Sequence, residues 1–158
     1  MTRDMVCMYE TEMTLGEVMG MVERYPYFHG FPIVESAQCK YLRGYITTRS
    51  VRNACAVEAK SSPGGLGYDS KVSFQLGHSS AQNPGSSSFE YYWSSWTDHF
   101  LPVVLHTTPV IAVYDLFVHM GLRHVLVVHD GLLCGIVSKK DLLAYVDNSE
   151  DILQKYFF

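Results

Sequence analysis

Hydrophobic side chains recur three or four residues apart in two stretches of the chain, one in each half. This spacing is that of one face of an amphipathic helix. The two sets are Leu15, Val18, Met19 and Val22, and Val110, Val113, Phe117 and Met120. The first helix is expected to follow Thr14, which is spaced with Glu17 as a capping box. The second is expected to have Thr108 as its N-cap, Pro109 in its first position and Gly121 at its end.

Two short hydrophobic runs and a further helix follow each of these stretches. The runs are too short for helices and rich in β-branched residues, which is typical of paired strands. Asp130 and Gly131, which separate the second pair of runs, form a dipeptide typical of a tight hairpin turn. The predicted elements are strands over 31–34, 41–46, 125–129 and 132–137, and helices over about 49–58 and 139–146.

The two halves of the chain repeat one pattern. Residues 44–50 align with 135–141 without a gap, and residues 31–34 align with 125–128. The sequence therefore predicts an α/β (α+β) fold of two pseudo-symmetric units of βαββα type, each a small sheet packed against two helices, joined by a long linker. The expected boundaries are 1–60 for the first unit, 61–100 for the linker and 101–158 for the second unit.

The linker is rich in Gly, Ser and Pro and carries little periodic pattern. It ends in a cluster of aromatic residues: Phe89, Tyr91, Tyr92, Trp93, Trp96 and Phe100. One interpretation is that these rings pin the linker onto the folded units. The other is that they form a docking surface for a further domain or subunit.

Composition and charge exclude several classes of function. Hydrophobic residues make up 47% of the chain, and a net charge of −4 with no basic run gives no reason to expect a nucleic-acid partner. No CxxC pair and no His/Cys cluster with zinc-ligand spacing is present, so no metal is expected. The sequence also lacks a nucleophile elbow and a phosphate loop, so we expect it not to be an enzyme.

The doubled unit resembles the CBS domain, which occurs in pairs called Bateman modules. The resemblance is carried by the motif that enters the last helix, a glycine, two hydrophobic residues, Thr or Ser and an acid three positions later, which is complete at 135–141. Residues 121–128 and 135–143 are more narrowly similar to the second CBS domain of CLC chloride channels and chloride/proton exchangers. Residues 30–34 and 42–46 are similar to the first CBS domain of that family.

The resemblance implies a regulatory domain on the cytoplasmic face of a membrane, as the soluble tail of an integral membrane protein. Its own transmembrane domain would then lie outside this sequence, and a homodimer through the CBS helices is expected. It also implies that an adenine nucleotide (ATP, ADP or AMP) binds where the two CBS units meet. The residues implied are Phe28, His29, Gly30, Phe31, Ser138, Lys140 and Asp141.

Each of these positions also has a structural explanation. Asp141 can accept hydrogen bonds from both ribose hydroxyls, as acids do in dinucleotide folds, but with Ser138 it also forms a capping box that needs no ligand. Phe28 stands where some family members have tyrosine, and His29 where they have serine. Phe28 can stack on a base but lacks a hydroxyl.

The repeat is not symmetric at the acid, because Ser50 is the counterpart of Asp141. The second pseudo-symmetric cleft, near Leu122, Arg123, His124 and Ser50, is therefore expected to be degenerate. We expect one competent nucleotide site in each chain.

Two further interpretations stay open. The chain could be a nucleotide-free dimerisation scaffold that associates through apolar helix surfaces, or a CBS sensor from another parent protein, such as a kinase subunit or a different transporter. The helix residues considered for association are Val51, Ala54, Leu142 and Leu143.

Overall fold

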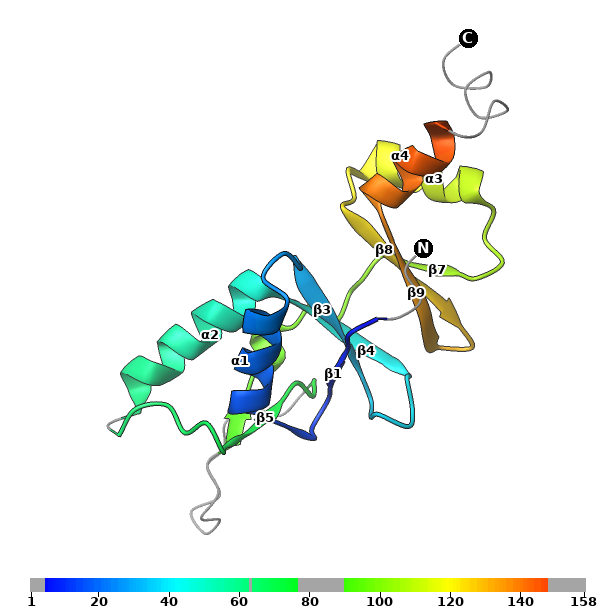
Figure 1. Cartoon of the computed structure of the whole chain (residues 1–158). Coiled ribbons are helices and arrows are strands. Elements are labelled where there is room, and N and C mark those ends of the chain that lie inside the picture. Colours follow the sequence, from blue (N-terminus) through cyan, green and yellow to red (C-terminus); the bar gives the residue numbers. More distant parts are fainter. Residues whose placement is uncertain (1–4, 63, 77–89, 148–158) are drawn as a thin grey trace. The chain divides into compact units, whose positions relative to one another are not determined.

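The computed structural model describes residues 5–62, 64–76 and 90–147 and divides the chain into two compact units (Figure 1). The N-terminal unit spans Val6–Phe100, and the C-terminal unit contains Leu101 and the described residues that follow it. None of the helices in these described ranges has the length and apolar character needed to cross a bilayer.

A small sheet covered by two helices forms the centre of the N-terminal unit (Figure 1). Its middle strand pairs in parallel with one neighbour and antiparallel with the other. Side chains from both helices and all three strands meet in one hydrophobic core. The elements are β1 (Met8–Tyr9), α1 (Leu15–Arg24), β3 (Gly30–Val34), β4 (Leu42–Thr47) and α2 (Thr48–Ser61).

The C-terminal unit has the same order and the same pairing. Its elements are β7 (Val103–Leu105), α3 (Val110–Met120), β8 (His124–His129), β9 (Leu132–Ser138) and α4 (Lys139–Asp147). Both units are thus βαββα in order, which confirms the predicted α/β fold and the internal repeat.

The repeat extends to irregularities of the strands. The pairing of β3 with β4 shifts after Ile33, and the pairing of β8 with β9 shifts after Val127, at aligned positions. Each shift leaves one residue, Arg43 or Cys134, without a strand partner, which is the arrangement of a β-bulge. A shared bulge is a stronger sign of common architecture than shared hydrophobicity.

The ends of the helices follow the sequence with one exception. Thr14 and Glu17 form the predicted capping box, and Gly121 ends α3 at a φ of 62°. Thr108, however, is not the N-cap of α3, so that prediction is wrong. Pro109 is the N-cap, because its ψ of 140° is not helical and its carbonyl accepts the first helical bonds, from Ala112 and Val113.

The hairpin turn at Asp130 and Gly131 is confirmed. Their φ angles are 49° and 81°, and two consecutive positive φ values are what the predicted tight turn requires.

The linker contributes a second sheet to the N-terminal unit. In this sheet β5 (Lys71–Ser73) lies between β2 (Met13–Thr14) and β6 (Glu90–Tyr92), and a short helix, η1 (Ser94–Trp96), follows. Strands of two or three residues are too short to produce a visible period, so no pattern in the sequence predicts them.

The described aromatic residues of the linker behave unequally. Tyr91 and Trp93 are buried in the core of the N-terminal unit, and Trp96 packs against it, which confirms the pinning interpretation for these rings. Phe100 is 91% exposed and is not pinned. Phe89 lies outside the described residues.

Candidate functional site

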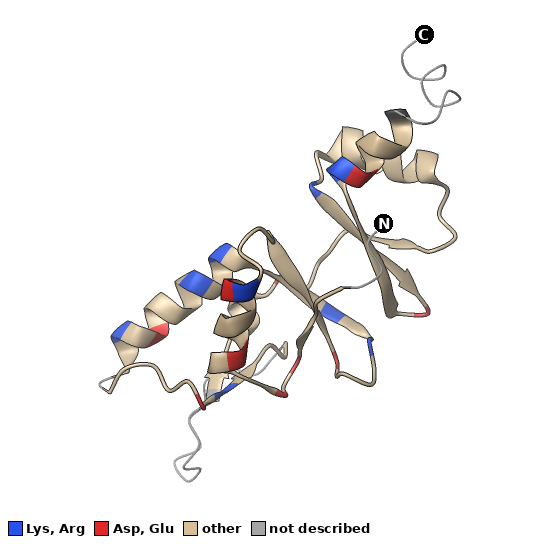
Figure 2. Ribbon diagram, in the orientation of Figure 1, with Lys and Arg blue, Asp and Glu red and all other residues tan. Residues whose placement is uncertain are grey.

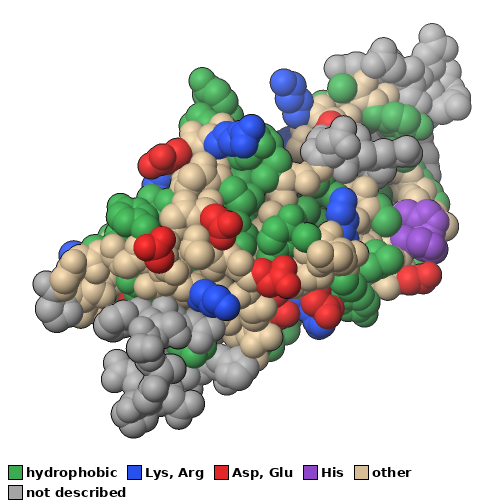
Figure 3. All heavy atoms as spheres, turned by 60° about the horizontal axis from the view of Figure 1, so that its bottom comes forward, with side chains coloured by type: hydrophobic (Ala, Val, Ile, Leu, Met, Phe, Trp, Pro, Cys, Tyr) green, Lys and Arg blue, Asp and Glu red, His purple; other side chains and the backbone are tan. Residues whose placement is uncertain are grey.

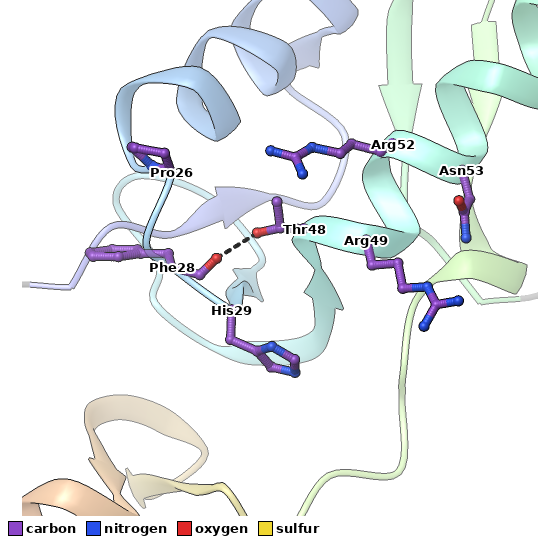
Figure 4. Close-up of a pocket in the computed structure, with 7 residues that line it drawn as sticks. All are labelled: Pro26, Phe28, His29, Thr48, Arg49, Arg52 and Asn53. Atoms are coloured by element: carbon purple, nitrogen blue, oxygen red, sulfur yellow. Dashed lines mark hydrogen bonds between the residues drawn. The ribbon is translucent and has the colours of Figure 1, made fainter.

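A pocket of about 420 Å³ lies beside the first turns of α2 in the N-terminal unit (Figure 4). Two of the predicted site residues, Phe28 and His29, line it. The remaining lining residues come from the turn after α1 and from the start of α2. The full lining is Pro26, Phe28, His29, Thr48, Arg49, Arg52 and Asn53.

Thr48 fixes the backbone of the pocket's outer segment. Its hydroxyl donates to the carbonyl of Phe28 at 2.8 Å (Figure 4), and its N–H donates to the carbonyl of His29 at 2.9 Å. The C-terminal unit repeats the second of these bonds, from the N–H of Lys139 to the carbonyl of Arg123 at 3.1 Å. The first residue of the helix therefore sets the position of the segment that precedes β3.

Gly30 is required by close packing in the same segment. A Cβ placed there would lie 2.4 Å from the carbonyl oxygen of Ile46 and 2.8 Å from the Cα of Thr47. Because both contacts are with the backbone of the neighbouring strand, rotation of a side chain cannot relieve them. Gly30 thus allows β3 and β4 to approach closely beside the pocket.

Phe28 presents part of an aromatic ring to solvent. The ring stacks on Tyr25 with centroids 4.9 Å apart and an angle of 25° between the planes, and it remains 44% exposed. The ring centroid of Phe31 lies 5.8 Å from that of Phe28, and Phe31 is fully buried in the core. Only the backbone of Phe31 is therefore available to a ligand. The exposed part of Phe28 offers a flat ligand a surface that the protein already holds in place.

Two arginines of the pocket were missed by the sequence analysis. Arg49 and Arg52 are exposed and lie three residues apart on α2. Among the described residues, neither guanidinium has an ion-pair or hydrogen-bond partner. Their spacing on one helix was visible in the sequence, but their place beside Phe28 depends on the bonds made by Thr48.

Ser138 and Asp141 lie together at the start of α4 in the C-terminal unit. The N–H and hydroxyl of Ser138 donate to one carboxylate oxygen of Asp141, at 2.9 and 2.6 Å, and the N–H of Asp141 donates to the hydroxyl of Ser138 at 3.2 Å. This reciprocal arrangement is a capping box. It holds the carboxylate at the first turn of the helix, beside the exposed Lys140.

The matching position of the N-terminal unit has the cap without the acid. The hydroxyl of Thr47 accepts from the N–H of Ser50 at 3.0 Å, and the hydroxyls of the two residues are 2.8 Å apart. Thr47 and Ser50 thus occupy the places of Ser138 and Asp141, but they offer hydroxyl groups where the other unit offers a carboxylate.

The pKa of Asp141 makes its capping bonds dependent on pH. Burial is the largest single influence and raises the pKa of the carboxyl group, but several lowering influences, the hydrogen bonds from Ser138 first among them, together outweigh it, so the pKa lies below its ordinary value of 3.8. The stabilisation by the charged cap is therefore present above pH 3.8 and is lost as the pH falls through the lower pKa of the folded state.

We expect this loss to appear as a difference between the wild type and Asp141→Asn, whose amide oxygen can still accept from Ser138. The wild type should unfold at a higher temperature at about pH 6, and this advantage should disappear at about pH 2. Calorimetry of both proteins across this range measures it. A constant difference in melting temperature at every pH would contradict the assignment.

The helix surfaces considered for association are largely internal. Val51 and Ala54 are fully buried in the N-terminal core and Leu142 is 4% exposed in the C-terminal core, so none of the three can contact a partner. Their apolar spacing marks the inner face of each helix. Leu143 alone of the four is well exposed, and other hydrophobic side chains reach the surface elsewhere (Figure 3).

No group of three or more metal-ligating side chains that could hold an ion occurs in the described ranges. The candidate groups are an aromatic ring and two guanidiniums in the N-terminal unit and, taken by itself, a capped carboxylate in the C-terminal unit.

Comparison with solved structures identifies the same architecture in other proteins. Staphylococcus aureus OpuCA matches with a TM-score of 0.62 at 12% identity, covering 92% of this chain and 94% of that one. A CBS domain protein of Pyrobaculum aerophilum, solved in complex with AMP, matches with a TM-score of 0.57 at 19% identity, covering 98% of this chain and 92% of that one.

Comparison of sequences gives the relationship. The H(+)/Cl(-) exchange transporter 3 of Mus musculus is 31% identical over 137 residues, which cover 87% of this chain and 16% of that protein. The chain thus spans less than a fifth of the length of this curated relative. Residues 1–57 and 97–148 match the CBS domain family. The chain therefore belongs to the CBS domain family, as a tandem pair whose sequence is similar to that of H(+)/Cl(-) exchange transporters.

Proposed function

We propose that this chain is the nucleotide-binding regulatory tail of a CLC-type chloride channel or chloride/proton exchanger, and that it is not an enzyme. The observation that carries the proposal is the pocket, which is lined by the half-exposed Phe28 and by two arginines whose guanidiniums have no ion-pair or hydrogen-bond partner among the described residues. These are the groups that a planar base and its phosphates require. The similarity to exchange transporters supports the choice of parent protein.

Each part of the nucleotide has a proposed contact. The base stacks on Phe28 beside His29, close to the backbone of Gly30 and Phe31. The ribose hydroxyls donate to Asp141, whose carboxylate is held by Ser138. Lys140 adds positive charge beside that carboxylate. The ligand proposed is an adenine nucleotide, ATP, ADP or AMP. In support, the Pyrobaculum relative of the same fold was solved with AMP.

Regulation follows from binding if the tail can adopt two arrangements that differ in their affinity for the nucleotide. A ligand shifts an equilibrium by no more than this difference in affinity. The proposed location is the cytoplasmic face of a membrane, with the transmembrane domain of the same protein as the partner that responds.

Titration calorimetry with ATP, ADP and AMP tests the proposal. We expect one nucleotide in each chain, because Ser50 replaces the acid at the second position. Asp141→Asn should weaken binding about tenfold or more, since hydrogen bonds to a charged group contribute about 1.5–3 kcal/mol. Phe28→Ala should weaken it by a similar factor through the loss of stacking.

Ser138→Ala is the matched control for Asp141→Asn. It removes the cap and keeps the carboxylate, so it should lower the stability of the protein by about 1 kcal/mol and weaken binding less than Asp141→Asn does. Two equivalent sites, or affinity that Asp141→Asn leaves unchanged, would contradict the proposal.

The alternative is a nucleotide-free scaffold that dimerises through its helices. Exposed hydrophobic side chains on α3 and α4 favour it: Val118, Met120, Leu143 and Tyr145. No thermal shift with any nucleotide at millimolar concentration, together with a dimer by sedimentation, would favour the scaffold over the sensor.

A further inference from the structure

We propose that His106 and His129, in the C-terminal unit, form a binding site for a divalent transition-metal ion such as Zn²⁺ or Cu²⁺. The site lies outside the nucleotide pocket, so it does not depend on the proposed function. It supplies two protein ligands rather than a complete set of three or four, and water completes the coordination of the ion.

The pairing of β7 with β8 brings the two histidines together. These strands are parallel and Leu105 pairs with Val128, so the residues that follow this pair, His106 and His129, stand side by side. The N–H of His106 donates to the carbonyl of Val128 at 2.9 Å, which continues the pairing beyond β7. The two imidazole rings are in contact, with centroids 4.2 Å apart and an angle of 71° between their planes. The backbone thus holds both side chains at one place.

The contact between the rings suits two bonds to one ion. Two nitrogen ligands of a tetrahedral zinc ion lie about 3.3 Å apart, from Zn–N bonds of about 2.0–2.1 Å. Rings that already touch reach this spacing by turning about their own side-chain bonds. Both histidines are exposed, so an ion reaches them from solvent. Imidazole nitrogen is a preferred ligand of zinc, copper and nickel.

The charge around the two rings favours a cation. The carboxylate of Asp130 lies 3.6 Å from Nε2 of His129, and Figure 2 shows this acidic position, in red, at the turn of the β8–β9 hairpin. The described basic residues of the C-terminal unit stand at the opposite end of the hairpin, about 20 Å away along six residues of strand. These residues are Arg123, Lys139 and Lys140.

The aligned place in the N-terminal unit holds a cation that the protein itself supplies. By the shared register of the first two strands, Glu10 and Glu35 stand where the two histidines stand. Both carboxylates lie close to guanidinium nitrogens of Arg43, at 3.7 and 2.8 Å. The counterpart of this arginine in the shared bulge is Cys134, which has no basic group. The C-terminal unit therefore keeps the pair of ligating side chains and lacks the internal cation.

Titration calorimetry with Zn²⁺, Cu²⁺ and Mg²⁺, on the chain without a histidine tag, tests the site. One Zn²⁺ is expected to bind in each chain, Cu²⁺ should bind more tightly, and Mg²⁺, which prefers oxygen ligands, should not bind. His106→Gln and His129→Gln should each weaken Zn²⁺ binding by about tenfold or more. His119→Gln is the matched control, because it removes another exposed histidine of the same unit, and it should leave the affinity unchanged.

Two further variants separate the histidines from their neighbours. Asp130→Asn gives an Asn-Gly pair, which suits the turn, and should weaken binding less than either histidine variant because the carboxylate acts through its charge. Cys134→Ser should leave binding unchanged, since the thiol donates to the carbonyl of Leu132, with Sγ and the oxygen 3.4 Å apart.

Proton NMR locates the ion directly. Cu²⁺ added below one equivalent should broaden the ring signals of His106 and His129 before those of the other histidines. A Zn²⁺ affinity that either histidine variant leaves unchanged, or that Cys134→Ser lowers as much as they do, would overturn the inference.

Discussion

Replacing Trp93 with alanine is expected to lower the free energy of unfolding of the N-terminal unit by about 3–5 kcal/mol, the range for removing a large aromatic side chain from a core. Trp93 is fully buried and meets the ring of Phe74 edge-on, with centroids 6.1 Å apart. The backbone N–H of Trp93 donates to the carbonyl of Ser73 at 2.7 Å. The linker therefore supplies a central part of the core, and the loss of this ring leaves a cavity that its neighbours cannot fill.

Urea unfolding followed by far-ultraviolet circular dichroism measures this change without using the tryptophan as the probe. Phe100→Ala is the matched control, because this aromatic residue of the same segment is 91% exposed. It should change stability by less than about 0.5 kcal/mol. If the two variants were equally stable, the linker would not be part of the folded unit.

Adding one methyl group at Gly30 is expected to destabilise the protein by about 3 kcal/mol, the upper part of the usual range for overpacking. The new Cβ would lie 2.4 Å from the carbonyl oxygen of Ile46, so β3 and β4 must separate to admit it. Phe28 and His29 directly precede β3, so a shift of this strand also displaces them. The Gly30→Ala protein should therefore bind nucleotide more weakly than the wild type.

Gly20→Ala is the control, and its effect should have the opposite sign. Gly20 is exposed in α1, and nothing lies within 4 Å of an added Cβ. Alanine is favoured over glycine in a helix by up to about 1 kcal/mol, so this variant should be more stable than the wild type. Thermal unfolding of both variants measures the pair. Destabilisation by both, to a similar extent, would show that close packing at Gly30 is not the cause.

The architecture could be predicted from the sequence because the signals were local and occurred twice. The helical spacing of apolar residues, the Asp130-Gly131 turn and the alignment of 44–50 with 135–141 each stand within a few residues of the element they specify. In a repeat, each half also provides a check on the other, since an element predicted in one half is expected at the aligned position of the other. The boundary of α3 was wrong by one residue because the cap depends on the ψ angle of Pro109, which the sequence does not reveal.

The remaining errors have a different origin. The strands β5 and β6 consist of three residues each and are defined by pairing with a distant segment, which a local pattern does not contain. An apolar stripe such as that of Val51 and Ala54 shows that one helix face is covered, but not whether the cover is its own core or a partner. Arg49 and Arg52 were missed because a pocket is formed by segments that only folding brings together.

The two hydrogen bonds of Thr48 have a mechanical consequence. They tie the carbonyls of Phe28 and His29 to one end of α2, a helix of 14 residues and therefore about 21 Å long. A small rotation of this helix about its tied end displaces its other end much further, since a tilt of about 5° moves Ser61 by about 2 Å. A small displacement at the start of β3 is thereby amplified where the chain leaves α2 for the linker.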